Sequence, residues 1–264
     1  MYFGRLDDFS KSNTTIHQNL ELNFNLNKVG KVNSTTLGQV ISKCVNLKAI
    51  KINLYTNYIG DEGIQNISSS FGQLKYLTVL ILELQYNSIG VEGILHLAQE
   101  LKKIKNLQIL KLYLGRNFIN QDGTNHLAFG LCQLYNLRCL TLGLFGNGVN
   151  DDGVFHLSLA IGGLINLRKL RLVLSNNQIT DEGIINLSSS LKFCKKLLSL
   201  KLTLFENNIS FKGAQNAISS IRKHSDIKAL KLNLESNNLL RREAFAIKQN
   251  IFKIKKLVKC NFQC

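Results

Sequence analysis

An asparagine recurs every 30 residues along this chain, and that period constrains the fold more than any other feature. Its eight occurrences are Asn27, Asn57, Asn87, Asn117, Asn147, Asn177, Asn207 and Asn237. A fixed period of this length is typical of stacked structural repeats, each burying its apolar face against its neighbours. The sequence therefore predicts a solenoid, rather than the one or two globular domains that 264 residues would otherwise suggest.

Each repeat divides into two halves with different periodicity. The first half alternates apolar and outward-facing residues, as at Leu170, Leu172 and Leu174, which is typical of a strand. The second half has apolar residues at helical spacing, which in this repeat are Ile184, Leu187, Leu191 and Cys194. A strand and a helix repeated in one direction give parallel strands joined by crossover helices. We therefore expect an α/β solenoid with one parallel sheet of eight or nine strands inside and helices outside.

The array has recognisable boundaries. Residues 1–16 fit the repeat poorly and are expected to form an irregular N-terminal cap, whereas residues 17–264 hold eight repeats and a terminal half-repeat. The half-repeat offers only a strand, so we expect either a continuing chain, such as a kinase fusion, or a partner to cover it. Without an apolar signal core or a long apolar run, the chain is predicted to be cytoplasmic, without membrane insertion.

The cysteines and charges follow the repeat. Cysteine replaces leucine or isoleucine at four repeat positions, which predicts reduced core thiols at Cys44, Cys194, Cys260 and Cys264. Lysine and arginine exceed aspartate and glutamate by 33 − 17, a net charge of +16. Acidic residues begin the predicted helices and lysines end them, which suits the helix dipole and explains much of this excess. The balance favours acidic proteins, nucleic acid or anionic surfaces as partners.

The repeat pattern LxxLxLxLxxNxIxDEG resembles a leucine-rich repeat, and its NxIxDEG tail is similar to the ribonuclease-inhibitor-like subclass. An additional x-Leu pair separates it from the usual LxxLxLxxN, and this variant resembles large repeat families of single-celled eukaryotes. Two extra residues preserve strand parity, so the inward leucines stay inward. The resemblance implies a horseshoe with its parallel sheet on the concave side and its helices on the convex side. It also implies that the periodic asparagines form a ladder that satisfies backbone groups in the turn.

The outward strand positions supply the candidate binding residues of the concave face. They are Lys51, Tyr55, Lys111, Tyr113, Phe145, Arg171, Lys201, Phe205 and Lys231. Tyrosine, phenylalanine and arginine are favoured at interface hot spots, although scattered aromatic residues are also normal on a solvated sheet. Arg171, Lys201 and Lys231 are expected side by side on adjacent strands, which indicates an acidic partner unless the side chains spread into water.

The sequence contains no recognisable catalytic signature. It lacks a glycine-rich phosphate loop, an HExxH motif and a nucleophile elbow, so we expect no catalysis, cofactor or small-molecule substrate. His96, His126 and His156 share one helix position, but asparagine replaces them in other repeats, which favours hydrogen bonding over metal binding or pH sensing. The predicted function is a non-enzymatic protein-binding scaffold or adaptor whose partner has an acidic surface. Alternatives are a nucleic-acid or polyanion binder and a regulator of a small GTPase.

Overall fold

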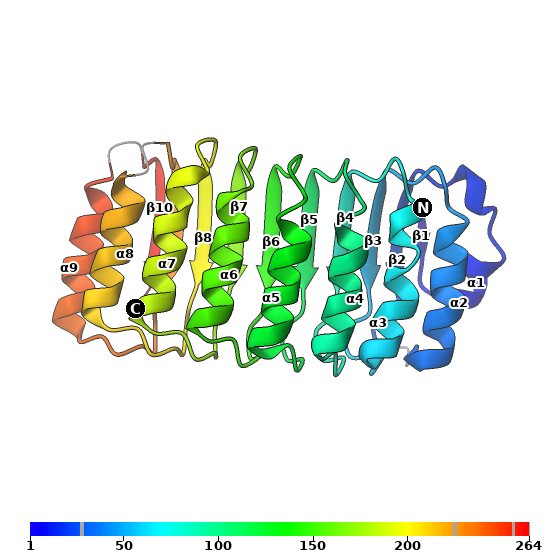
Figure 1. Ribbon diagram of the computed structural model, residues 1–264, viewed down its shortest axis with the longest axis horizontal. Helices are drawn as coiled ribbons and strands as arrows, with labels where there is room; N and C mark the ends of the chain where they lie inside the picture. Colours follow the sequence, from blue (N-terminus) through cyan, green and yellow to red (C-terminus); the bar gives the residue numbers. More distant parts are fainter. Residues whose placement is uncertain (27–28, 224–225, 255–256, 264) are drawn as a thin grey trace.

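The computed structural model, which describes residues 1–26, 29–223, 226–254 and 257–263, contains one parallel sheet. Its ten strands in the described residues follow chain order, so each strand pairs with the strand of the next repeat (Figure 1). The strands are β1 (Tyr2–Phe3), β2 (Asn19–Asn23), β3 (Ala49–Asn53), β4 (Val79–Glu83), β5 (Ile109–Tyr113), β6 (Cys139–Gly143), β7 (Lys169–Val173), β8 (Ser199–Thr203), β9 (Ala229–Asn233) and β10 (Lys259–Gln263). The fold is therefore an α/β repeat solenoid.

Helices alternate with the strands and lie side by side across one face of the sheet (Figure 1). They are α1 (Leu6–Ser10), α2 (Gly30–Ser42), α3 (Gly60–Ser68), α4 (Val91–Leu101), α5 (Asn120–Leu131), α6 (Asp151–Gly162), α7 (Asp181–Ser190), α8 (Phe211–Lys223) and α9 (Arg241–Phe252). Short 3₁₀ turns occupy Thr14–Ile16, Phe71–Gln73 and Leu191–Phe193. We call the uncovered side the open face of the sheet.

The strand register is constant: each residue pairs with the equivalent residue of the neighbouring repeat. Leu170 lies opposite Leu140 on β6 and Leu200 on β8. The inward residues of β7, Leu170 and Leu172, are 1% and 0% exposed, while the alternate residues of the strand, such as Arg171, reach the open face. The predicted parity is therefore confirmed: one set of side chains builds the core under the helices, and the alternate set is displayed on the open face.

The N-terminal end of the sheet differs from the sequence prediction, whereas the C-terminal end agrees with it. The first 16 residues, expected to be irregular, add strand β1 beside β2 and bury Phe9, whose ring centroid lies 5.2 Å from that of Phe3. At the other end β10 pairs with β9, and Cys260 and Phe262 are partly buried. Strand β10 is the expected strand of the terminal half-repeat, whereas β1 was not expected and brings the described sheet to ten strands.

Buried thiols fill core positions as the sequence predicted. Cys44 and Cys194 are buried, and this burial raises the pKa of each thiol to about 11, so both stay protonated at neutral pH. Cys132, Cys139 and Cys260 are also free thiols, and Cys264 lies outside the described residues. In the part of the chain that the structure describes, no helix is both long enough and apolar enough to span a membrane.

The first aspartate of the DEG and DDG segments bonds across the repeat boundary. The Asp151 carboxylate accepts hydrogen bonds from the backbone N–H groups of Thr180 at 2.8 Å and Gly183 at 3.0 Å. Asp181 likewise accepts from the Ser210 N–H at 2.7 Å. These carboxylates therefore satisfy backbone donors at the next helix N-terminus, in addition to suiting the dipole of their own helix.

Candidate functional site

The periodic asparagines form a ladder of hydrogen bonds in the turns that follow the strands. Asn117 donates its Nδ2 to the carbonyls of Leu84 at 3.0 Å and Leu114 at 2.8 Å. Its Oδ1 accepts from the N–H groups of Asn87 at 3.0 Å and Ile89 at 2.9 Å. Each described ladder asparagine donates to a carbonyl of the preceding repeat and accepts from a backbone N–H there. We call this set the asparagine ladder; Asn27 lies outside the described residues.

An aromatic cluster stands on the open face where strands β3 to β6 end. Its members are Tyr55, Tyr86 and Phe145, with ring centroids 5.5 Å apart for the first pair and 6.3 Å for the second. The Phe145 ring covers Gly115 so closely that an added Cβ there would overlap it. The Arg116 guanidinium carbon lies 5.7 Å from the Phe145 centroid, within cation–π range. The cluster is thus held by its neighbours and remains partly exposed.

Sequence reasoning missed two members of this surface, Tyr86 and Arg116. Both precede a ladder asparagine directly and adopt left-handed backbone, with φ of 57° and 56°. Strand parity assigns both positions to the inward set but does not hold for a residue in this conformation, so the alternating pattern did not include them among the outward positions. The available signal was their fixed place directly before the asparagine. Thr56 occupies the same repeat position and has the same left-handed conformation.

The other predicted aromatic residues lie apart from the cluster. Tyr113 is half-buried beside Gly143, where an added Cβ would stand 3.5 Å from the tyrosine Cδ1. Phe205 is also half-buried, and no aromatic ring contacts it within the described ranges. The structure therefore brings Tyr55 and Phe145 together through Tyr86, but it does not bring Tyr113 or Phe205 to them.

Three basic residues occupy one row of the open face on β7, β8 and β9. Arg171 lies opposite Lys201, and Lys201 lies opposite Lys231. Among the described residues, no carboxylate lies within ion-pair distance of any of the three. A cavity of about 230 Å³ opens beside Lys201, Lys231 and Lys259. We call Arg171, Lys201 and Lys231 the basic ladder, and it is suited to an anionic ligand group.

Lys51 stands in the same row but in a different environment. Its Nζ lies 3.1 Å from Glu21 Oε1 and 3.4 Å from Glu83 Oε1 on the two flanking strands. The hydrogen bond to Glu21 raises the pKa of the Lys51 amine, and the charges of both carboxylates add to this effect. Lys111, farther along the row, lies between Ile81 and Thr141. Unpaired positive charge is therefore concentrated toward the C-terminal strands of the open face.

No protein-family model matches the chain, and no characterised protein matches it significantly.

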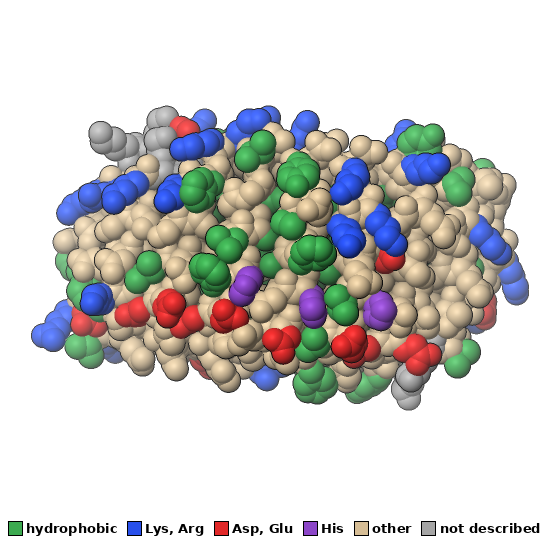
Figure 2. Space-filling view, in the orientation of Figure 1, with side chains coloured by type: hydrophobic (Ala, Val, Ile, Leu, Met, Phe, Trp, Pro, Cys, Tyr) green, Lys and Arg blue, Asp and Glu red, His purple; other side chains and the backbone are tan. Residues whose placement is uncertain are grey.

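The helix-covered face carries charge bands and exposed apolar side chains (Figure 2). Acidic residues run along it near the helix N-termini, at Glu62, Glu92, Asp122, Asp152 and Glu182. Exposed apolar side chains on and just after α5, α6 and α7 include Phe129, Phe155, Leu159 and Phe193, none of which the sequence analysis selected. Histidines form a row on this face, and the His156 Nδ1 lies 3.0 Å from the carbonyl oxygen of Asp152. Within the described residues, no group of three or more possible ligands is placed to hold a metal ion.

Proposed function

We propose that this protein is a leucine-rich repeat solenoid of the ribonuclease-inhibitor-like type, and that its open face docks another protein. The constant 30-residue register, the inward leucines and the asparagine ladder support this assignment. Helices pack about 8–10 Å apart, whereas paired strands lie ~4.8 Å apart. Stacking units of such unequal width favours a horseshoe with the open face on its concave side.

The aromatic cluster is the observation that carries this proposal. Phe145 presents a partly exposed ring that is held by Gly115 and Arg116, and Tyr86 is held between the Tyr55 and Phe145 rings, so little side-chain entropy is lost when a partner covers them. Tyrosine and arginine are among the residue types enriched in interface hot spots. The basic ladder lies farther along the same face and would attract a partner with an acidic surface.

The geometry of the rings favours a protein over nucleic acid as the partner. The ring planes in the cluster are inclined by 67° and 68° to each other, so the rings offer no parallel platform for successive bases. Phe145 also has one side against Gly115. We therefore propose a scaffold or adaptor without catalytic activity, in which the aromatic cluster anchors the partner and the basic ladder steers its approach.

The test begins by purifying the protein with its native neighbours and identifying what co-elutes. Affinity for that partner is then measured over a salt series for the parent and for Phe145→Ala. We expect Phe145→Ala to weaken binding by about 2 kcal/mol or more, because it removes a central anchor. Lys201→Ala should mainly slow association and flatten its salt dependence.

Phe129→Ala is the matched control, since it removes an exposed phenyl ring from α5 on the helix-covered face. It should leave the affinity unchanged. A denaturant titration of Phe145→Ala checks that exposure of Gly115 has not unfolded the turn. Normal partner binding by Phe145→Ala, together with tight, salt-sensitive binding of single-stranded nucleic acid, would replace this proposal with a polyanion binder.

A further inference from the structure

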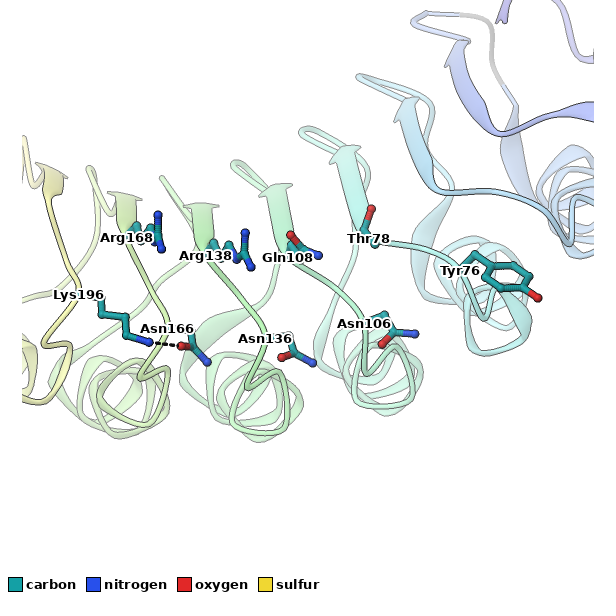
Figure 3. Close-up of a pocket in the computed structure, with 9 residues that line it drawn as sticks. All are labelled: Tyr76, Thr78, Asn106, Gln108, Asn136, Arg138, Asn166, Arg168 and Lys196. Atoms are coloured by element: carbon teal, nitrogen blue, oxygen red, sulfur yellow. Dashed lines mark hydrogen bonds between the residues drawn. The ribbon is translucent and has the colours of Figure 1, made fainter.

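A groove of about 520 Å³ lies at the edge of the sheet opposite the asparagine ladder, between the N-terminal ends of the strands and the ends of the helices (Figure 3). It crosses five successive repeats. Its lining residues are Tyr76, Thr78, Asn106, Gln108, Asn136, Arg138, Asn166, Arg168 and Lys196. We call it the edge groove. It contains three basic side chains, and no carboxylate is among the described residues that line it.

A second set of periodic asparagines forms the helix side of the groove. The Nδ2 atoms of Asn106, Asn136 and Asn166 donate to backbone carbonyls of the preceding repeat, at 3.0 Å to Lys75, 2.8 Å to Lys105 and 2.9 Å to Tyr135. These bonds fix the amides, so their oxygens remain as acceptors. The Asn166 oxygen accepts from Lys196 Nζ at 2.7 Å, whereas the oxygens of Asn106 and Asn136 have no partner among the described residues.

Two arginines form the strand side of the groove. Arg138 and Arg168 are exposed, and Figure 3 shows their guanidinium groups next to each other along this side. Their backbones are fixed, because the Arg168 N–H donates to the Arg138 carbonyl at 2.8 Å and the Arg138 N–H donates to Gln108 at 2.8 Å. In the described ranges no carboxylate pairs with either arginine. A guanidinium is a planar fork that matches a carboxylate or phosphate in two-bond geometry.

The spacing of the repeats accommodates an extended peptide. The groove lies between a layer of strands about 4.8 Å apart and a layer of helices about 8–10 Å apart, so equivalent groove positions are separated by an intermediate distance. Alternate residues of an extended peptide are about 6.6–6.8 Å apart, which falls in that interval. Such a peptide would place one side chain beside each arginine and direct backbone N–H groups to the asparagine oxygens.

We propose that the edge groove binds an extended acidic peptide segment with carboxylates on alternate residues, paired with Arg138 and Arg168. The asparagine oxygens would accept from the backbone N–H groups of the peptide, while the arginines would pair with its carboxylates. Among the described residues that line the groove, Tyr76 supplies the single aromatic ring, which is insufficient for a series of stacked bases. This inference rests on the proposed function, because it names the chemistry of a second segment that a docked protein presents.

The test measures fluorescence anisotropy of a short labelled peptide in which glutamate and serine alternate, titrated with the whole protein. The variants are Arg138→Ser/Arg168→Ser and the control Lys212→Ser/Arg242→Ser, which removes two exposed positive charges near the N-termini of α8 and α9. We expect the arginine pair to weaken binding at least about tenfold, because each guanidinium makes charge-assisted hydrogen bonds. The control should change affinity less than about twofold.

A peptide of the same composition with its glutamates in one block tests the spacing and should bind more weakly. Equal binding of both peptides, equal binding by the arginine variant, or tighter binding of oligothymidylate would each overturn the inference. Phe145→Ala separates the two sites: it should leave peptide affinity unchanged. If it also leaves partner affinity unchanged while the peptide results hold, the proposed open-face docking fails and the edge groove stands.

Discussion

The asparagine ladder and the basic ladder are both built by repeating a residue type in register, yet they differ in what surrounds them. Each amide in the first is enclosed by backbone donors and acceptors, as at Asn207, which donates to Leu174 and Leu204 at 3.0 Å. The basic ladder has no anionic partner among the described residues. A satisfied ladder stabilises the fold, whereas an unsatisfied row of like charges lowers its stability. Repetition alone therefore does not identify a binding surface; unsatisfied groups do.

The largest expected effect concerns the satisfied ladder. Asn207→Ala should lower the free energy of unfolding by about 1–3 kcal/mol, because it leaves buried backbone groups unpaired, including the Ile179 N–H that donates to Asn207 at 3.1 Å. The neighbouring residue provides the control: Asn208 is exposed, and Asn208→Ala should change stability by less than about 0.5 kcal/mol. Urea denaturation of both variants checks this. Coincident denaturation midpoints would show that the ladder amides contribute no more to stability than surface asparagines do.

Replacing lysine by glutamate should have opposite effects on stability in the basic ladder and at Lys51. Lys201→Glu places a carboxylate between Arg171 and Lys231 and should stabilise the protein, whereas Lys51→Glu places a third carboxylate between Glu21 and Glu83 and should destabilise it. Cross-strand pairs of exposed charges contribute about 0.2–1 kcal/mol. Thermal unfolding at low and high salt measures the difference, which should shrink as salt screens it. If both substitutions changed the stability in the same direction, the surroundings of Lys51 and Lys201 would not differ electrostatically as described.

The sequence predicted much of the fold, because the period and the alternation of leucines determine which residues face the helices. Leu170 and Leu172 are buried as expected, and the strands pair in the expected register. The N-terminal strand and helix were not predicted, since residues 1–16 carry no repeat that could be compared with others. The cross-repeat role of Asp151 was also missed, because a hydrogen bond to the next repeat leaves no separate periodic signal beyond the helix-start pattern.

The candidate site was less predictable than the fold. Alternation placed Tyr55 and Phe145 on the open face, but it could not show that Tyr86 joins them, since a left-handed residue reverses the direction of its side chain. It also could not distinguish Lys51, which is paired with two carboxylates, from Lys201, which is unpaired. Both distinctions depend on which side chains occupy neighbouring repeats in space.

The smallest expected effect tests how the asparagine ladder imposes backbone conformation on the residue before it. Ser236 is exposed with φ of 54°, directly before Asn237, whose Nδ2 donates to the Glu235 carbonyl at 3.3 Å. Gly146 occupies the same repeat position with φ of 62°. A side chain in this region costs about 1–2 kcal/mol, whereas glycine adds unfolded-state entropy worth about 0.4–1 kcal/mol.

Because the first quantity exceeds the second, Ser236→Gly should raise the free energy of unfolding by a few tenths of a kcal/mol. The reverse change, Gly146→Ser, should lower it somewhat more, since a Cβ at that position would stand 3.0 Å from the Arg116 Cδ. Urea denaturation of the two variants gives both values. A loss of stability in Ser236→Gly would mean that the ladder does not hold this residue in the left-handed region in solution, and that the turn relaxes where the ladder approaches its end.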